Sequence, residues 1–402
     1  MKKKINFKLS TTQTIMLSFF LAILVGSVLL ALPISSANGE AVSYIDALFT
    51  ATTSICVTGL VTLPTVSTWS LFGQVVILIL IQIGGLGVIT IMSGFMISLH
   101  RKMGIKDRML IQDAFNLNTL SGIVKFIKKV LVGTFVVEGT GAILYMIVFV
   151  PEYGAKGIWI SIFNSISAFC NAGIDIISEN SLCDYALNPM INIVTSALII
   201  LGGIGYIVWW DVIRVIKDMR NKKLKCFSNL TLHSKIALSA TGVLIVVGAV
   251  VFFIFEYNNP LTMKDYSLFD KIQASLFQSV TTRTAGFATI PQQNLTNASA
   301  IVSLLLMFIG GSPVGTAGGI KTVTIAVLIF AAFATIKNKE DVVFFQRTIP
   351  KQAVSKAVAV VCMSFMIMFI STLLLSAVTN ANALDIDRKS TRLNSSHCRL
   401  SR

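Results

Sequence analysis

Seven long apolar stretches recur along this chain of 402 residues. They lie near residues 14–32, 70–99, 127–150, 190–213, 236–256, 300–335 and 354–379. Each is long enough to cross a bilayer core of about 30 Å as a helix. Only 13% of the residues are charged, against about 25% in an ordinary soluble domain. So little polar surface excludes a soluble enzyme, and the sequence predicts an all-α polytopic membrane protein.

Three shorter, semi-polar segments lie between these stretches, at 43–58, 157–172 and 267–285. They are too short or too polar to span a membrane, and each runs into a stretch that contains glycine. This pattern predicts re-entrant helices that enter and leave on one side. Such backbone is tolerated at membrane depth only where it lines protein or a water-filled path.

The three segments are copies of one pattern. Phe49–Leu60 reads FTATTSICVTGL, Phe163–Asp175 reads FNSISAFCNAGID, and Phe277–Thr289 reads FQSVTTRTAGFAT. Each has a phenylalanine, then small and hydroxyl residues, then a lone glycine. The glycines are Gly59, Gly173 and Gly286, spaced by 114 (173 − 59) and 113 (286 − 173) residues. A fixed spacing of this kind indicates an internal repeat.

A second motif, two adjacent glycines, follows each lone glycine at a similar distance along the chain. It reads IGGLG at Ile83–Gly87, LGGIG at Leu201–Gly205 and IGGS at Ile309–Ser312. One repeat is therefore helix, pore helix, glycine turn, helix. The predicted parts are a cytoplasmic N-terminus 1–13, repeat 1 at 14–100, repeat 2 at 125–216, repeat 3 at 235–336, the first helix of repeat 4 at 350–385 and a tail 388–402.

The tail reads RKSTRLNSSHCRLSR, is basic and has no period. It resembles a translated vector or adapter sequence and is excluded from the fold prediction; a genuine basic tail is the alternative. The fourth glycine would fall near position 400, within this tail. About three and a quarter of four repeats are therefore expected.

Basic residues predict the orientation. The N-terminal lysines and the segments Arg101–Lys129, Arg214–Lys235 and Lys337–Lys356 hold 23 Lys and Arg, and all lie on one side of the predicted spans. The positive-inside rule places that side in the cytoplasm. The other side carries acids, which raise the local cation concentration or are ordinary solvated loop residues. These acids are Glu40, Asp46, Glu152, Asp175, Glu179, Asp184, Glu256, Asp265 and Asp270.

Glycine turns that meet at one axis favour a path for a monovalent cation. Glycine permits backbone conformations that point carbonyl oxygens at the axis. Rings of carbonyls replace the hydration shell of such a cation. None of the three turns has a carboxylate before its glycine. Close helix packing is the alternative role for these glycines.

The segment GGSPVGTAGGIK, Gly310–Lys321, holds five glycines and a proline inside an apolar stretch. It must break the helix within the membrane, which predicts a movable constriction below the glycine turns. The candidate gating residues are Gly310, Gly311, Ser312, Pro313, Gly315, Thr316, Gly318, Gly319 and Lys321. Lys321 is either a functional intramembrane cation or a lysine that snorkels to the interface.

Two other charges fall within or beside predicted spans. Glu138 is expected to pair with another helix, and Arg283 to brace the third turn against an acid or carbonyls. The six cysteines and three histidines are scattered, without metal-ligand spacing. The sequence therefore predicts no metal site, and no other residue indicates a cofactor in this chain. The basic residues gather on the predicted cytoplasmic side, which explains the net charge of +15 without a nucleic-acid partner.

At these residues the chain resembles the Trk/Ktr/HKT superfamily of potassium transporters, and within it the KtrB-like membrane subunits of bacterial Ktr systems. TTSICVTGL, AFCNAGID, SVTTRTAGF and IGGSPVGTAGGIKT carry the resemblance, which extends from about residue 10 to 385. It implies four repeats around one ion path. It also implies a selectivity filter made by Val57, Thr58, Gly59, Asn171, Ala172, Gly173, Thr284, Ala285 and Gly286.

The resemblance further implies potassium uptake, often sodium-dependent, by a homodimer in the bacterial cytoplasmic membrane. The expected partner is a cytoplasmic ring of KtrA/TrkA-type regulatory subunits, which would hold the ATP, ADP or NAD. The basic loops Arg101–Arg108 and Lys217–Lys225 are candidate docking surfaces, and membrane lipid is the alternative partner. In the superfamily that the chain resembles, glycine rather than serine at the first filter position goes with potassium preference, and this chain has Gly59. A sodium-coupled carrier of a small organic solute, or a membrane scaffold without transport, are the competing hypotheses.

Overall fold

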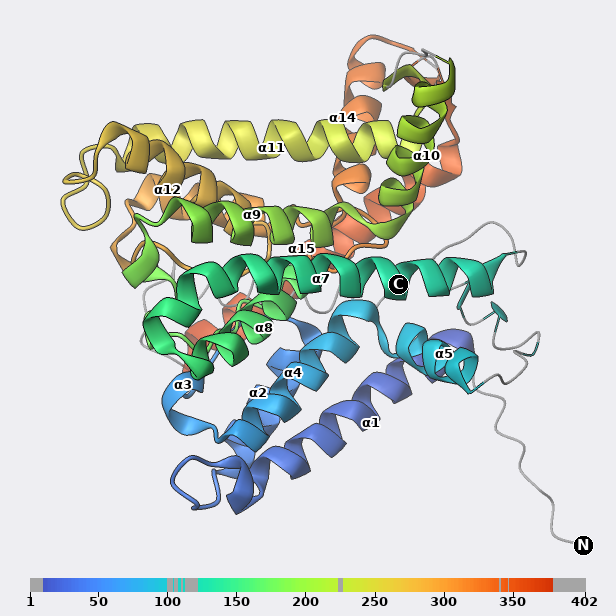
Figure 1. Cartoon of the computed structure of the whole chain (residues 1–402). Coiled ribbons are helices and arrows are strands. Elements are labelled where there is room, and N and C mark those ends of the chain that lie inside the picture. The colour runs from blue at the N-terminus through green and yellow to red at the C-terminus, as the bar shows by residue number, and fades with distance from the viewer. Residues whose placement is uncertain are drawn as a thin grey trace, which may run out of the picture.

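The computed structural model describes residues 10–99, 104, 108–109, 111–112, 122–222, 227–339, 341–345 and 347–378. Within them the chain is almost entirely helical (Figure 1). The predicted N-terminus before Ser10, most of Arg101–Arg108, the end of Lys217–Lys225 and the tail 388–402 lie outside the described residues.

The first repeat contains α1 (Thr11–Ala31), the pore helix α2 (Tyr44–Cys56), and α4 (Leu71–Leu86) with α5 (Val88–Ser98). The short helices η1 (Pro33–Ser35) and α3 (Thr65–Thr68) lie in its connecting segments. The pore helix falls within the segment 43–58 that the sequence predicted to be re-entrant. Repeat 1 therefore has the predicted order of helix, pore helix, turn and helix.

The second repeat follows the same order, with α7 (Ile123–Tyr153), the pore helix α8 (Ala155–Cys170), α9 (Pro189–Ile204) and α10 (Tyr206–Lys222). The third contains α11 (Leu232–Glu256), the pore helix α12 (Leu268–Thr281), α13 (Asn297–Phe308) and α14 (Thr322–Ile336). The 3₁₀ helices η2 (Cys183–Tyr185), η3 (Phe227–Asn229) and η4 (Gln292–Asn294) lie in connections. In Figure 1 the pore helices lie toward one end of the molecule, and α5, α10 and α14 lie toward the other.

After α14 the chain forms a small hairpin that the sequence did not predict. Strands β1 (Val342–Phe344) and β2 (Arg347–Ile349) pair antiparallel, and α15 (Lys351–Val378) follows them. Phe344 lies against Phe330 of α14, with ring centroids 3.9 Å apart. The hairpin therefore packs against one side of α14, on a small apolar cluster that includes Val327 and Ile349.

Side-chain caps fix where many of the helices begin. In each case an oxygen of the residue before the helix accepts a hydrogen bond from a backbone N–H of the first turn, which would otherwise lack a partner. These residues are Ser10, Ser70, Asn188, Thr231, Ser267 and Thr296. The caps set where each apolar helix starts relative to its neighbours.

Two of the predicted straight spans are bent. The stretch 70–99 divides at Gly87 (φ 85°) into α4 and α5, which meet at 97°. The stretch 190–213 divides at Gly205 (φ 95°) into α9 and α10, which meet at 98°. Each glycine takes a positive φ that an L side chain rarely adopts. Among the described residues, α1, α7, α11 and α15 are long and apolar enough to span a membrane, and the two bent pairs raise the number from 4 to 6.

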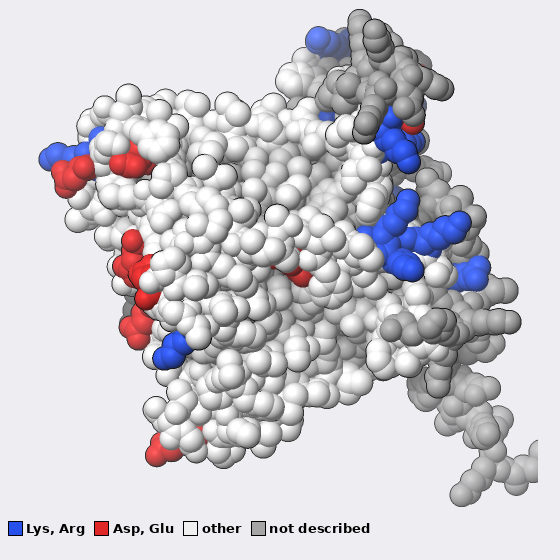
Figure 2. Space-filling model, in the orientation of Figure 1, with Lys and Arg blue, Asp and Glu red and all other residues white. Residues whose placement is uncertain are grey.

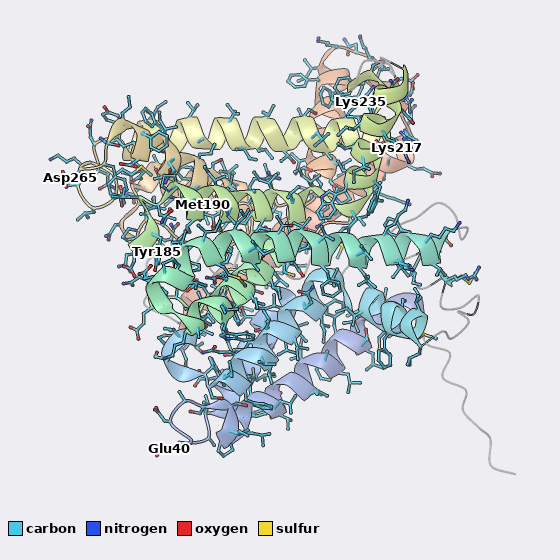
Figure 3. The ribbon with its side chains drawn as sticks, in the orientation of Figure 1. Glu40, Tyr185, Met190, Lys217, Lys235 and Asp265 are labelled. Atoms are coloured by element: carbon cyan, nitrogen blue, oxygen red, sulfur yellow. The ribbon has the colours of Figure 1, made fainter. Side chains whose placement is uncertain are left out.

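Charged side chains separate to the two ends of the molecule. Figure 2 shows most of the acids along one edge, with a few basic residues, and the other basic residues at the opposite edge. Glu40 and Asp265 lie at the first end, and Lys217 and Lys235 at the other (Figure 3). Two of the predicted outer acids are instead buried, because Asp175 and Glu256 are 9% and 0% exposed. Glu256 accepts hydrogen bonds from the backbone N–H and the hydroxyl of Thr296.

Candidate functional site

The three lone glycines lie in turns with one backbone signature. We name Val57–Gly59 turn 1, Asn171–Gly173 turn 2 and Thr284–Gly286 turn 3. The first residue of each turn is left-handed, with φ of 54°, 59° and 72°. Each glycine, two positions later, has φ of 70°, 64° and 98°. Non-glycine residues rarely adopt positive φ, so the repeat in sequence is also a repeat in conformation.

A hydroxyl group braces each turn from behind. It lies near the C-terminus of the pore helix and binds the backbone of the residue that follows the glycine. The pairs are Thr53 with Leu60, Ser167 with Ile174 and Thr281 with Phe287. Each side chain replaces a backbone partner that the irregular turn lacks. The sequence showed hydroxyl residues here but could not assign their partners.

Turns 2 and 3 touch through their backbones. A Cβ added to Gly173 would lie 2.3 Å from the carbonyl oxygen of Ala285 and 2.6 Å from the Cα of Gly286. Only glycine fits so close an approach. The structure thus brings together two of the predicted turns that are more than a hundred residues apart in sequence.

The double glycines place turn 1 beside turn 2. A Cβ on Gly84 of α4 would lie 2.1 Å from the carbonyl oxygen of Ile55, at the end of pore helix α2. A Cβ on Gly85 would lie 2.2 Å from Sγ of Cys170, at the end of α8. In the same way, a Cβ on Gly202 would lie 1.9 Å from the carbonyl oxygen of Phe169. The double glycines therefore let helix backbone reach the pore-helix ends, which is the packing role that small residues serve in membranes.

The segment Gly310–Lys321, named here the 310–321 loop, leaves the helix and closes on itself. Gly310 N–H donates to Ile320 O, and Thr322 N–H donates to Gly311 O, both at 3.0 Å. The chain enters and leaves through this narrow neck, because a Cβ on Gly310 would lie 1.9 Å from the carbonyl oxygen of Gly318. The helix is broken where the sequence predicted it.

Backbone hydrogen bonds dock the loop on the bend between α9 and α10. Ser312 N–H donates to Gly203 O at 2.8 Å, and Thr316 N–H donates to Gly202 O at 2.9 Å. In return, Tyr206 N–H donates to Val314 O at 3.1 Å. The bend at Gly205 thus frees backbone groups that the loop of repeat 3 binds.

Side chains of turns 2 and 3 also bind the loop. The Asn171 amide donates to the Thr316 hydroxyl at 2.7 Å, and that hydroxyl donates to Phe169 O at 2.8 Å. Gly318 N–H donates to the Thr284 hydroxyl at 3.0 Å. The resemblance implied only backbone roles for Asn171 and Thr284, whereas the structure turns their side chains to the loop.

Two basic side chains bind carbonyls of the same loop. Arg283 Nη2 donates to Gly310 O at 3.3 Å, which fits the expected bracing by carbonyls. Lys321 Nζ donates to Ala317 O at 2.8 Å, within the loop itself. Each cation is therefore held by carbonyl oxygen, the acceptor that a broken helix provides.

Asp175, two residues after Gly173, is a buried acid that the sequence placed among the outer surface residues. The Ser181 hydroxyl donates to its carboxylate at 2.6 Å. Burial raises the pKa of Asp175 to about 6, despite this and other hydrogen bonds that lower it. No other turn has an acid two residues after its glycine. This difference is the signal by which the sequence could have singled out Asp175.

Glu138 pairs across repeats as expected. Gln82 of α4 donates to both carboxylate oxygens of Glu138 in α7, at 3.1 Å each. The sequence did not single out Gln82, although one amide within an apolar stretch is a recognisable signal. Among the described residues, no group of three His, Cys, Asp or Glu could hold a metal ion.

The chain is similar in sequence to known cation transport proteins. A family model described as TrkH, a cation transport protein, matches residues 1–386. The potassium/sodium uptake protein NtpJ of Enterococcus hirae is 40% identical over 94% of this chain and 81% of its own length. The Ktr system potassium uptake protein B of Bacillus subtilis is 39% identical over 93% of this chain and 82% of its own.

A solved structure has the same fold. The potassium transporter TrkH from Vibrio parahaemolyticus matches with a TM-score of 0.72, covering 98% of this chain and 84% of that one. The two are 16% identical in sequence, so this likeness concerns the fold.

Proposed function

Because the chain belongs to the TrkH family of cation transport proteins, we propose that it takes up potassium across the bacterial cytoplasmic membrane. It acts as the ion-translocating subunit of a Ktr/Trk-type system. Related proteins are named potassium uptake proteins, and one is named a potassium/sodium uptake protein. The chain is a multi-pass membrane protein and not an enzyme.

One observation carries the proposal. Each of the three pore helices ends in a turn whose first residue is left-handed and whose third residue is a glycine with positive φ. Backbone carbonyls of these turns select the ion, because carbonyl rings replace the hydration shell of a monovalent cation. The proposed filter residues are those of turns 1 to 3, Val57–Gly59, Asn171–Gly173 and Thr284–Gly286. The 310–321 loop, bound to turns 2 and 3, acts as the gate.

The proposed orientation places the basic end, with Lys217 and Lys235, in the cytoplasm. A cytoplasmic ring of nucleotide-binding regulatory subunits docks at this end, on a homodimer of the chain. We also propose that uptake depends on sodium, as the family resemblance implies; the Enterococcus hirae relative is named a potassium/sodium uptake protein.

The carrier hypothesis has less support. It needs a fixed charge that holds an organic solute, and Glu138 was its candidate. That carboxylate accepts two hydrogen bonds from Gln82 and one from the Cys170 thiol, inside a helix interface. The geometry therefore favours a structural pair over a solute site.

The test is rubidium uptake in cells without their own potassium uptake systems. Since the chain covers 81% of NtpJ, two forms are compared: the 402-residue chain, and residues 1–386 followed by the C-terminal part of NtpJ. We expect the fused form to take up rubidium and Gly286→Asp to abolish it. If the fused form takes up rubidium equally well with and without Gly286→Asp, the proposal is contradicted.

A further inference from the structure

A small cavity lies where turns 2 and 3 meet the 310–321 loop. Its lining includes Asn171, Thr241, Arg283, Gly311 and Ala317. It leaves about 10 Å³ of space for the centre of a water molecule. That is close to the minimum that a single buried water needs.

Two polar atoms of the residues that line this cavity have no hydrogen-bond partner within the described part of the chain. They are Nε of Arg283 and Oδ1 of Asn171. These side chains belong to residues only 6% and 1% exposed. A buried donor and a buried acceptor that are left unpaired each destabilise the folded chain.

The orientation of the Asn171 amide is fixed by its neighbours. The Thr316 hydroxyl gives its proton to Phe169 O, so it can only accept from Asn171. Nδ2 must therefore face Thr316, and Oδ1 is left as an acceptor. The two unpaired atoms beside the cavity are thus one donor, Arg283 Nε, and one acceptor, Asn171 Oδ1.

We propose that this cavity is a binding site for one water molecule, through which Asn171 and Arg283 together hold the 310–321 loop against the filter turns. The water accepts from Arg283 Nε and donates to Asn171 Oδ1. A monatomic anion would face the Asn171 oxygen, and a cation would face the guanidinium. Water is the small ligand that satisfies both atoms.

The water completes a continuous hydrogen-bonded connection. Asn171 binds the middle of the loop through Thr316, and Arg283 binds its neck at Gly310. Asn171 and Arg283 are therefore positioning residues that keep the loop closed. This role rests on the proposed function only where the loop is taken as the gate.

The water site is tested directly by an experimental structure of the 402-residue chain in lipid nanodiscs, at a resolution that shows ordered water. We expect one water within hydrogen-bonding distance of both Arg283 Nε and Asn171 Oδ1. An empty cavity would overturn the proposal. So would a density that strengthens when chloride is replaced by bromide, because an anion would then occupy the site.

The holding role is tested by thiol labelling of the loop, which needs no transport. Ser312 is 0% exposed, so Ser312→Cys reports opening by its rate of reaction with a maleimide, above the rate of the chain without it. We expect Asn171→Leu to raise this rate roughly fivefold, as loss of its buried hydrogen bond to Thr316 predicts. Thr316→Val should raise the rate at least as much, because it also removes the bond to Phe169 O. The double variant should exceed Thr316→Val very little, because either single change already removes the bond between Asn171 and Thr316.

The matched control is Asn192→Leu. Asn192 is another buried asparagine with an unpaired Oδ1, but it binds Ala186 O, in the connection before α9. It should leave the labelling rate unchanged. Additive effects of Asn171→Leu and Thr316→Val, or equal effects in Asn192→Leu, would overturn the holding role. If Asn171→Leu and Thr316→Val label faster but no form of the chain takes up rubidium, the holding role is supported and the proposed function is contradicted.

Discussion

At each of the three glycine turns, one hydroxyl group lies behind the residue that follows the glycine. In turn 2 this is Ser167, which both donates to Ile174 O and accepts from Ile174 N–H. The hydroxyl takes the place of a regular backbone partner. The shape of the turn therefore depends on a side chain that lies outside the turn, in the pore helix.

Removal of this hydroxyl should reduce selectivity. A buried hydrogen bond contributes about 1 kcal/mol, so we expect Ser167→Ala to lower the ratio of rubidium to sodium uptake roughly fivefold in the fused form. Ser161→Ala is the control, because Ser161 lies in the same helix, is equally buried and binds only Gly157 O among its described contacts. An equal loss in both variants would show that the brace has no special role.

Asp175 predicts a pH dependence of uptake. Its pKa is raised to about 6 by burial, so it is ionised at pH 7.5 and largely protonated at pH 5. Tyr145 of α7 and Cys183 of η2 are the titratable groups that interact with it. An ionised Asp175 attracts cations to turn 2. We therefore expect the KM for rubidium to rise as the external pH falls through about 6.

The raised pKa of Asp175 also makes the stability of the folded chain depend on pH. The pKa of Asp175 in the folded chain lies above its ordinary value of 3.8, so the folded state binds the proton more tightly. Stability is therefore highest below about pH 4 for this group and declines as the pH rises to about 6. Asp175→Asn should remove both the change in KM and this decline; a KM that depends on pH as before would exclude Asp175 as the cause.

At the scale of helices, the second halves of repeats 1 and 2 bend by nearly equal angles, 97° and 98°. The sequences IGGLG and LGGIG predicted the repeat but not the bend, because apolar residues with glycine also fit a straight helix. Only the positive φ of Gly87 and Gly205 reveals it. The break at 310–321 could be predicted, since five glycines and a proline exclude a continuous helix.

Close packing of α9 on the pore helix gives a stability prediction. A Cβ at Gly202 would lie 1.9 Å from the carbonyl oxygen of Phe169, and overpacking of this kind costs about 1–3 kcal/mol. We expect Gly202→Ala to unfold at a lower temperature in detergent, measured by loss of the monodisperse protein. Gly242→Ala is the control, because no atom lies within 4 Å of its added Cβ. Equal melting of the two variants would contradict this packing role.

At the scale of the whole molecule, the pore helices lie toward the acidic end and most basic residues lie at the other. The sequence predicted the helical class and the three related turns, because hydropathy and spacing are local properties. It could not predict that Gly173 touches Gly286, or that Asn171 reaches Thr316. Such contacts depend on how the repeats pack, which no spacing along the chain determines.

The orientation has a simple test. With Cys183→Ser as background, we expect Asp265→Cys to react with an impermeant maleimide in intact cells. Lys217→Cys should react only after the cells are opened, because the basic end lies inside. The unmodified background measures reaction of the remaining cysteines. The reverse pattern would place the basic end outside and contradict the proposed direction of the ion path.

The central claim is that turns from different repeats meet to form one potassium path. The most direct measurement is rubidium uptake by Gly173→Ala beside Gly139→Ala in the fused form. A Cβ at Gly173 would collide with Ala285, and an alanine there would have to keep the positive φ of this position. At Gly139 of α7 an added Cβ would meet no atom within 4 Å. We predict that Gly173→Ala abolishes uptake and Gly139→Ala retains it; uptake at the parent rate in Gly173→Ala would contradict the claim.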